Sequence, residues 1–99
     1  MLQNLISDLK KLQDDDFVFI TFDDRNGTVL EFRCYPGEIH FGEIVDDNTV
    51  NGCKITTATT CIFGLDFEFN EKMIFDKPNN GIENCYMLTS SSGVLVIVF

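Results

Sequence analysis

The stretch LQDDDFVFITF, residues 12–22, changes its hydrophobic period midway and thereby decides the fold class. On its N-terminal side, apolar residues recur at spacings of three and four, which places them on one face of a helix. These residues are Leu2, Leu5, Ile6, Leu9 and Leu12. On its C-terminal side, from Phe17 to Phe22, nearly every position is apolar, which is typical of a strand covered on both faces. The pattern predicts a helix over residues 2–13, which the carboxylates at 14–16 end because they oppose the helix dipole.

The remainder of the chain is typical of short strands separated by turns. Asn26-Gly27 is the strongest short hairpin signal, and Pro36-Gly37 is a turn pair. The run from Cys61 to Phe69 alternates apolar and polar residues, so we expect its odd-numbered members to face the core. The predicted strands cover residues 17–22, 28–35, 39–45, 53–60, 61–69, 83–89 and 94–99, with a polar loop at 46–52. The last strand is almost wholly apolar, which indicates a central position, and the Thr-rich segment 53–60 is a candidate edge strand.

These elements define the fold class. Ninety-nine residues make one domain and are too few for two. We predict a single domain over residues 1–99 of the α+β class, with an N-terminal amphipathic helix packed on a six- or seven-stranded, mainly antiparallel sheet.

The charge balance restricts the kinds of partner. Sixteen acidic residues against seven basic ones give a formal net charge of -9. Such a surface repels phosphate backbones and anionic membranes, so we expect no direct nucleic-acid or lipid binding. It attracts a basic protein and speeds the encounter, although the same charge also serves to keep a Phe-rich domain soluble. No basic, apolar leader precedes the helix and the longest apolar run, 94–99, cannot span a bilayer, so we expect a cytoplasmic protein.

Few residues offer catalytic or metal-binding chemistry. His40 is the only histidine, and the four cysteines, Cys34, Cys53, Cys61 and Cys85, have no CxxC spacing. We therefore expect buried, reduced thiols and no enzyme. The segment from Asp47 to Gly52 has the opening pattern of a calcium-binding EF-hand loop, but Ala58 stands where the closing Glu is needed. We predict a turn there, with no metal and no cofactor.

Acidic clusters at strand ends are the remaining signal. They could form one negative field, or they could be loop residues that only mark strand ends. Tyrosines are enriched at interfaces and are candidate anchors, the alternative being packing on a strand with a hydrated hydroxyl. The predicted partner-binding residues are Asp14, Asp15, Asp16, Asp23, Asp24, Glu43, Asp46, Asp47, Tyr35 and Tyr86.

The small size, the acidity, the helix over residues 2–12 and the Phe-rich strands together resemble bacterial immunity proteins of contact-dependent growth-inhibition and related polymorphic-toxin systems. The resemblance covers the whole chain in character and rests on no diagnostic motif. It implies a cytoplasmic protein that occludes the active site of a cognate toxin, often a basic nuclease. Two other functions stay open: a phage-type inhibitor that mimics DNA with its acids, and a structural or chaperone-like homodimer paired through the edge strand near residues 53–60. The oligomeric prediction is accordingly a monomer or an edge-strand homodimer.

Overall fold

The computed structural model describes residues 2–78, 81–82 and 84–99, without the side chains of residues 46–48 and 50. One helix, α1, is followed by seven strands, and a short 3₁₀ turn, η1, separates β2 from β3. The elements are α1 (Leu2–Lys10), β1 (Val18–Asp23), β2 (Val29–Cys34), η1 (Pro36–Glu38), β3 (Ile39–Val50), β4 (Cys53–Gly64), β5 (Phe67–Asp76), β6 (Cys85–Ser90) and β7 (Gly93–Val98). An N-terminal helix on a seven-stranded antiparallel sheet is the α+β arrangement that the sequence predicts.

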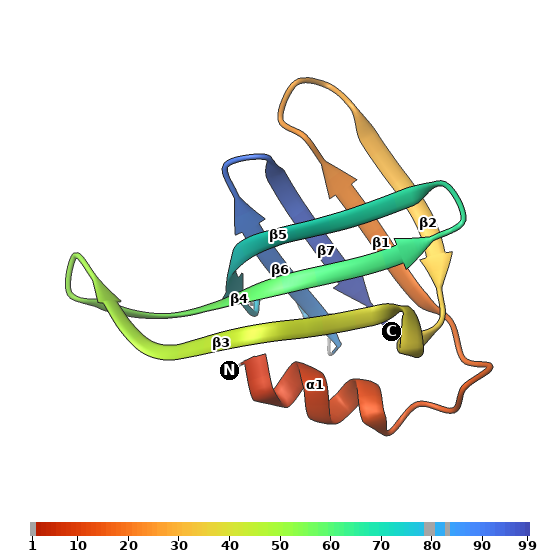
Figure 1. The fold of residues 1–99 in the computed structure, drawn as a ribbon, viewed down its shortest axis with the longest axis horizontal. Coiled ribbons are helices and arrows are strands. Elements are labelled where there is room, and N and C mark those ends of the chain that lie inside the picture. Colours follow the sequence, from red (N-terminus) through yellow and green to blue (C-terminus); the bar gives the residue numbers. More distant parts are fainter. Residues whose placement is uncertain (1, 79–80, 83) are drawn as a thin grey trace.

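The seven strands form one sheet in the order β2-β1-β7-β6-β5-β4-β3, and each neighbouring pair is antiparallel. The C-terminal strand β7 lies between β1 and β6, which confirms its predicted central position. The sheet is strongly bent, so that β3, β4 and β5 cross steeply over β1, β2, β6 and β7 (Figure 1). The two halves of one sheet thus act as two layers with their inner faces together.

The two layers meet at one corner, where the ring of Phe32 lies close to the backbone of Gly64. A Cβ added at Gly64, the last residue of β4, would lie 2.7 Å from a ring carbon of Phe32 on β2. Phe32 also packs against Phe67 of β5, with 5.0 Å between ring centroids. A side chain at position 64 would therefore have to displace the Phe32 ring, which occupies the space of a Cβ.

The core fills the space between the layers and is closed by α1, which lies along β3 (Figure 1). Leu2 and Leu5 are fully buried and Leu9 is nearly so, as their helical spacing predicts. The hydroxyl of Tyr86 on β6 donates a hydrogen bond to the Asp8 carboxylate of α1. Asp8 therefore ties the helix to the sheet, whereas the sequence pattern places it on the solvated face.

Several predicted boundaries are wrong, and each has a local cause. The predicted loop at 46–52 is mostly strand, since β3 continues to Val50 before the turn at 51–52. Residues 53–60 are not an edge, because β4 pairs with both β3 and β5. Phe63 and Leu65 do not face the core: their side chains are 43% and 98% exposed. The chain reverses in a two-residue turn at 65–66, so odd-numbered residues face outward on β4 and inward on β5.

The pairing of Asp8 with Tyr86 predicts a pH-dependent contribution to stability. The Tyr86 hydroxyl is the main cause that lowers the pKa of Asp8 below its ordinary 3.8, and Lys11 and Lys77 lower it further. A lowered folded-state pKa stabilises the fold above pH 3.8, and this stabilisation is lost as the pH falls through the folded-state value. We expect Tyr86→Phe to lower the thermal unfolding midpoint at neutral pH, and its difference from wild type to shrink in acid. Tyr35→Phe, which removes an exposed hydroxyl, is the control and should match wild type throughout. Wild-type and Tyr86→Phe curves that stay parallel into acid would contradict this account.

Candidate protein-binding surface

Four side chains from β1, β2 and their flanks form an exposed cluster on the outer face of the sheet, here called the aromatic patch: Phe17, Phe19, Arg33 and Tyr35. The rings of Phe17 and Tyr35 stack with 5.2 Å between centroids, and the Arg33 guanidinium carbon lies 4.6 Å from the centroid of the Phe17 ring. Phe17, Phe19 and Tyr35 remain 42%, 53% and 46% exposed. Three large rings and an arginine thus present a contiguous surface to solvent.

Strand alternation places these four residues together. Phe19 and Arg33 are direct cross-strand partners, and Phe17 and Tyr35 continue the same outer row by one step. The intervening residues Val18 and Cys34 are buried on the inner face. The sequence predicts β1 to be covered on both faces, and this is wrong, since more than half of Phe19 is exposed. Its outer face is open because α1 packs into the core on the inner side.

Carboxylates surround one end of the aromatic patch. Asp16 directly precedes Phe17, and the Glu38 carboxylate accepts a 3.0 Å hydrogen bond from the backbone N–H of Tyr35. Asp14 lines a hollow together with Pro36 and Gly37, so the link after α1 lies beside η1. The structure therefore brings the predicted acids of residues 14–16 to the same end of the sheet as the predicted anchor Tyr35.

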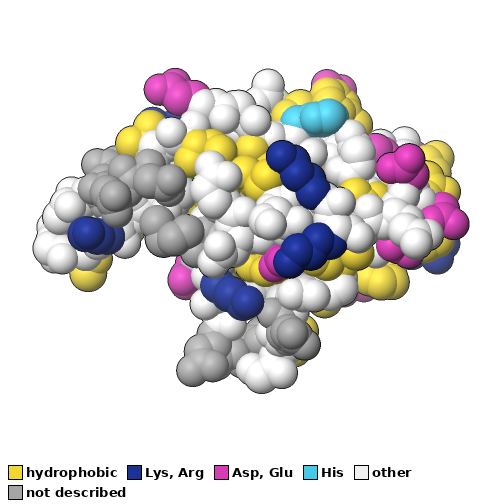
Figure 2. Space-filling view, turned by 90° about the horizontal axis from the view of Figure 1, so that it is seen from below, with side chains coloured by type: hydrophobic (Ala, Val, Ile, Leu, Met, Phe, Trp, Pro, Cys, Tyr) yellow, Lys and Arg dark blue, Asp and Glu magenta, His cyan; other side chains and the backbone are white. Residues whose placement is uncertain are grey.

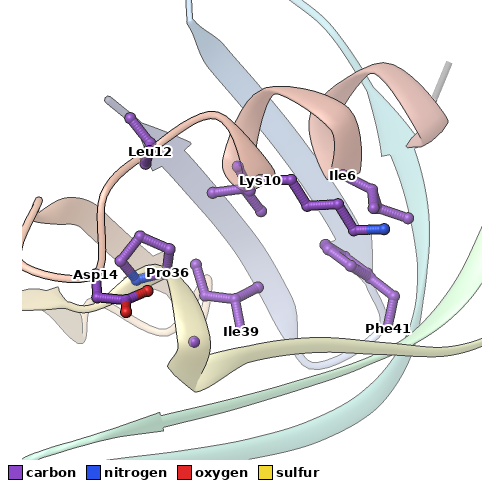
Figure 3. Close-up of a pocket in the computed structure, with 9 residues that line it drawn as sticks. Ile6, Lys10, Leu12, Asp14, Pro36, Ile39 and Phe41 are labelled. Atoms are coloured by element: carbon purple, nitrogen blue, oxygen red, sulfur yellow. The ribbon is translucent and has the colours of Figure 1, made fainter.

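The hollow beside this end lies between α1 and β3 (Figure 3). Its volume is about 320 Å³, and its walls are mainly apolar, with Ile6 of α1 above Phe41 of β3 at one end and Ile39 nearer Pro36. Lys10 extends across the opening toward Phe41, whereas Asp14 stands at the other end (Figure 3). The hollow is open and carries no cluster of reactive groups, so it extends the surface next to the aromatic patch and does not form an enclosed substrate site.

The other predicted acids lie elsewhere. Asp23 and Asp24 are at the opposite end of β1 and stabilise its hairpin, since their carboxylates accept backbone N–H groups from Arg25, Asn26 and Thr28 at 2.8–3.0 Å. The bonds from Asn26 and Thr28 lower the pKa of Asp24. Glu43 is exposed on β3, and the backbones of Asp46 and Asp47 belong to the same strand, while their side chains are outside the described part of the chain. The predicted set is therefore divided among separate corners of the molecule.

Tyr86 requires a correction. Its side chain is fully buried, stacks between Phe75 and Phe99 at 5.9 Å from each, and bonds to Asp8. A residue so enclosed has no surface to offer a partner. Tyr35 and Tyr86 are equivalent candidates in the sequence because tyrosines are enriched at interfaces, and only the tertiary structure separates them.

The basic side chains also have a preferred face. Figure 2 views the molecule from the side that carries α1, and Lys and Arg side chains occupy the middle of this face. Lys10 and Lys11 belong to α1 or its end, and Lys77 lies 5.0 Å from the centroid of the Tyr86 ring beneath it. Lys10, Lys11 and Lys77 thus place positive charge on the side of a strongly acidic chain that carries the helix.

The candidate catalytic groups are few. His40 on β3 is the cross-strand partner of Cys61 on β4, an adjacency that sequence alone cannot assign among four thiols. The His40 ring lies edge-on to Phe63, with 6.3 Å between centroids. Burial, with a smaller effect of Glu38, raises the pKa of the Cys34 thiol to about 11, which makes it a poor nucleophile. Among the described residues, no three His, Cys, Asp or Glu side chains are grouped to hold a metal ion.

No protein-family model, curated protein or solved structure matches this chain. Over the described residues, no helix has the length and apolarity needed to cross a membrane.

The positions of the four thiols predict an order of alkylation. Cys53 is exposed, Cys61 is half-buried, and Cys34 and Cys85 are buried. At pH 8 we expect iodoacetamide to modify Cys53 first and Cys34 and Cys85 only on unfolding, as followed by mass spectrometry. His40→Ala should leave the rate at Cys61 unchanged. A slowing of Cys61 by more than about tenfold in that variant would reveal an activated Cys–His pair, contrary to a purely binding role.

Proposed function

We propose that this chain is a small, non-catalytic binding protein that docks a basic protein partner through the aromatic patch. The observation that carries the proposal is the exposure of Phe17, Phe19 and Tyr35 beside Arg33 on one face. Large aromatic residues and arginine dominate the energetics of protein interfaces, and contiguous exposed apolar patches in monomers are often functional. An isolated exposed ring would carry little weight, but here two of the rings stack and the guanidinium lies over one of them.

The sign of the partner's charge follows from the surroundings of the aromatic patch. A formal charge of -9 and the acids of residues 14–16 next to Phe17 favour a positively charged surface. Charges at the rim of an interface mainly steer association, whereas the buried aromatic centre sets the rate of dissociation. The proposed division of work is therefore that residues 14–16 accelerate the encounter and the rings hold the complex.

The particular partner we propose is a bacterial toxin domain, which the chain would inactivate in the cytoplasm as an immunity protein. Inhibition by occlusion needs a rigid surface and no reactive groups, which suits a chain with one histidine and a weakly nucleophilic Cys34. The character-level resemblance to immunity proteins of polymorphic-toxin systems supports this choice. A nuclease is the toxin best matched to an acidic inhibitor, because its phosphate-binding site is basic.

The exposed rings of the aromatic patch predict which substitutions weaken toxin binding and reduce growth rescue. A candidate toxin domain would be co-expressed with this chain to measure growth rescue, and binding to its catalytically inactive form would be measured by calorimetry. We expect Phe19→Ala and Tyr35→Ala each to weaken binding by about thirtyfold, the effect of removing an interface hot spot, and to reduce growth rescue. Phe63→Ala is a matched control, since this ring is 43% exposed on the outer face of β4, and it should change binding less than threefold. Equal effects of Phe63→Ala and Phe19→Ala would contradict the location.

The rim charges predict a change in association rate. Asp14→Asn and Asp15→Asn combined should slow association with the toxin several-fold at low salt and flatten its salt dependence, with little effect on dissociation. Asp66→Asn and Glu68→Gln combined remove the same number of charges from β5 and its preceding turn and serve as the control. Asp16, Asp23, Asp24 and Asp76 are retained because their carboxylates accept backbone hydrogen bonds. Identical salt dependence in wild type and the first variant would show that Asp14 and Asp15 do not face the partner.

A further inference from the structure

The two edge strands of the sheet, β3 and β2, differ in whether they are protected from pairing with another strand. At one end β3 is interrupted by register shifts between Phe41 and Ile44 and between Val45 and Asn48, and α1 lies along it (Figure 1). At the other end β2 pairs with β1 in an unshifted six-residue register, and no other described strand pairs with it. Bulges and covering elements protect sheet edges from further pairing. β2 has no register shift, and the β4–β5 turn lies against its inner face, so within the described residues its outer edge is open to another strand.

The hydrogen-bonding groups on that edge can be assigned from the register. The Asp24 N–H donates to the Thr28 carbonyl at 3.1 Å, which makes 24 and 28 a bonded pair. Bonded and non-bonded pairs alternate along an antiparallel ladder, so the even-numbered residues of β2 bond to β1. The N–H and C=O groups of Val29, Glu31 and Arg33 therefore point to the open edge. The open ladder stops at Tyr35, whose N–H donates to the Glu38 carboxylate and whose carbonyl accepts the Glu38 N–H.

We propose that the open edge of β2 pairs with β2 of a second copy of this chain, antiparallel and centred on Phe32. In this register Glu31 of each copy lies opposite Arg33 of the other, and the two residues exchange both backbone hydrogen bonds. Their side chains share the outer face, so each dimer gains two cross-strand ion pairs.

The charge pattern selects this register over its neighbours. Pairing centred on Glu31 places two glutamates opposite each other, and pairing centred on Arg33 does the same with two arginines. Pairing centred on Leu30 leaves Glu31 opposite Val29. Like charges directly opposite one another destabilise a sheet, whereas opposite charges stabilise it. Among registers that join the odd-numbered edge groups, the one centred on Phe32 alone sets Glu31 against Arg33.

Exposed apolar residues beside the open edge of β2 also favour pairing with a second copy. Val29 and Leu30 of β2 are 53% and 39% exposed, and Leu65 at the β4–β5 turn is 98% exposed. A groove of about 200 Å³ beside the edge is lined by Leu30, Phe32 and Leu65. A second strand laid along β2 would lie next to this groove and reduce the exposure of its apolar residues.

The same features determine the strength of the dimer. One six-residue strand and a turn make an interface at the small end of the range for specific complexes, and two copies of charge -9 repel each other. We therefore expect a dimer that dissociates in the micromolar range at physiological salt. A foreign basic strand could in principle use the same edge, but Arg33 at its centre favours a partner strand with an acid at the matching position, which β2 itself supplies.

Charge reversal tests the register directly. Sedimentation equilibrium of the wild-type chain, from about 10 µM to about 1 mM, should show the mass rise from 11.2 kDa toward twice that value. Glu31→Arg alone places arginine opposite arginine across the dimer, and Arg33→Glu alone places glutamate opposite glutamate. Each single variant should therefore weaken dimerisation at least tenfold. The double variant Glu31→Arg with Arg33→Glu restores opposite charges and should dimerise within threefold of wild type. Thermal unfolding midpoints of all variants establish that each is folded.

Each other outcome overturns the proposal. A wild-type chain that remains at 11.2 kDa across the range shows that the edge is unpaired, or reserved for a foreign strand. A dimer that survives both single reversals uses another surface, and a folded double variant that stays monomeric rules out this register. The inference does not rest on the toxin partner: Phe19→Ala lies on β1, away from the edge, and should leave the dimer intact even where it abolishes partner binding.

Discussion

The contact of Gly64 with the ring of Phe32 is the constraint on which this architecture depends. It holds the turn between β4 and β5 on the inner face of β2, at the far end of the same sheet. A sheet of seven strands that stayed open would leave its inner face to be covered by a helix of only nine residues. By bending until its two halves meet, the sheet covers most of that face with itself, and α1 needs to close only the remaining gap with Leu2, Leu5 and Leu9.

Because the bent sheet covers its own inner face, its outer face is left exposed to solvent. Phe19 of β1, Phe63 of β4 and Ile74 of β5 are each more than 40% exposed, although their types are those of a core. Most are single exposed residues, which are common on protein surfaces. Phe19 differs because it lies opposite Arg33 and beside the stacked rings of Phe17 and Tyr35, so the aromatic patch lies on the two strands at the β2 end of the sheet.

The sequence was sufficient for features that depend on local periodicity. The leucine spacing located α1, Asn26-Gly27 located the first hairpin, and the apolar run 94–99 located a central strand. The sequence did not predict the burial of side chains whose surroundings come from distant strands. Phe63 and Phe67 look equivalent in an alternating run, yet the turn at 65–66 puts one outside and the other inside. Likewise, no local pattern reveals that Tyr86 is enclosed by Phe75 and Phe99 while Tyr35 is exposed, or that Asp8 turns inward to a residue 78 positions away.

The contacts of the acidic residues show that net charge alone does not indicate which carboxylates are available to a partner. Asp23 and Asp24 serve the hairpin, Glu38 caps the end of β2, and Asp8 fixes the helix, so part of the negative charge has structural work within the chain. The acids next to the aromatic patch are those of residues 14–16, of which Asp16 also accepts a 2.8 Å hydrogen bond from the backbone N–H of Gln13. A two-fold axis through the edge of β2 would set two aromatic patches on one continuous outer face, each with its acidic segment. Two equal sites on a common face bind a repeating or dimeric partner more tightly than either site alone, so pairing of the chain with itself would strengthen partner binding without any new contact.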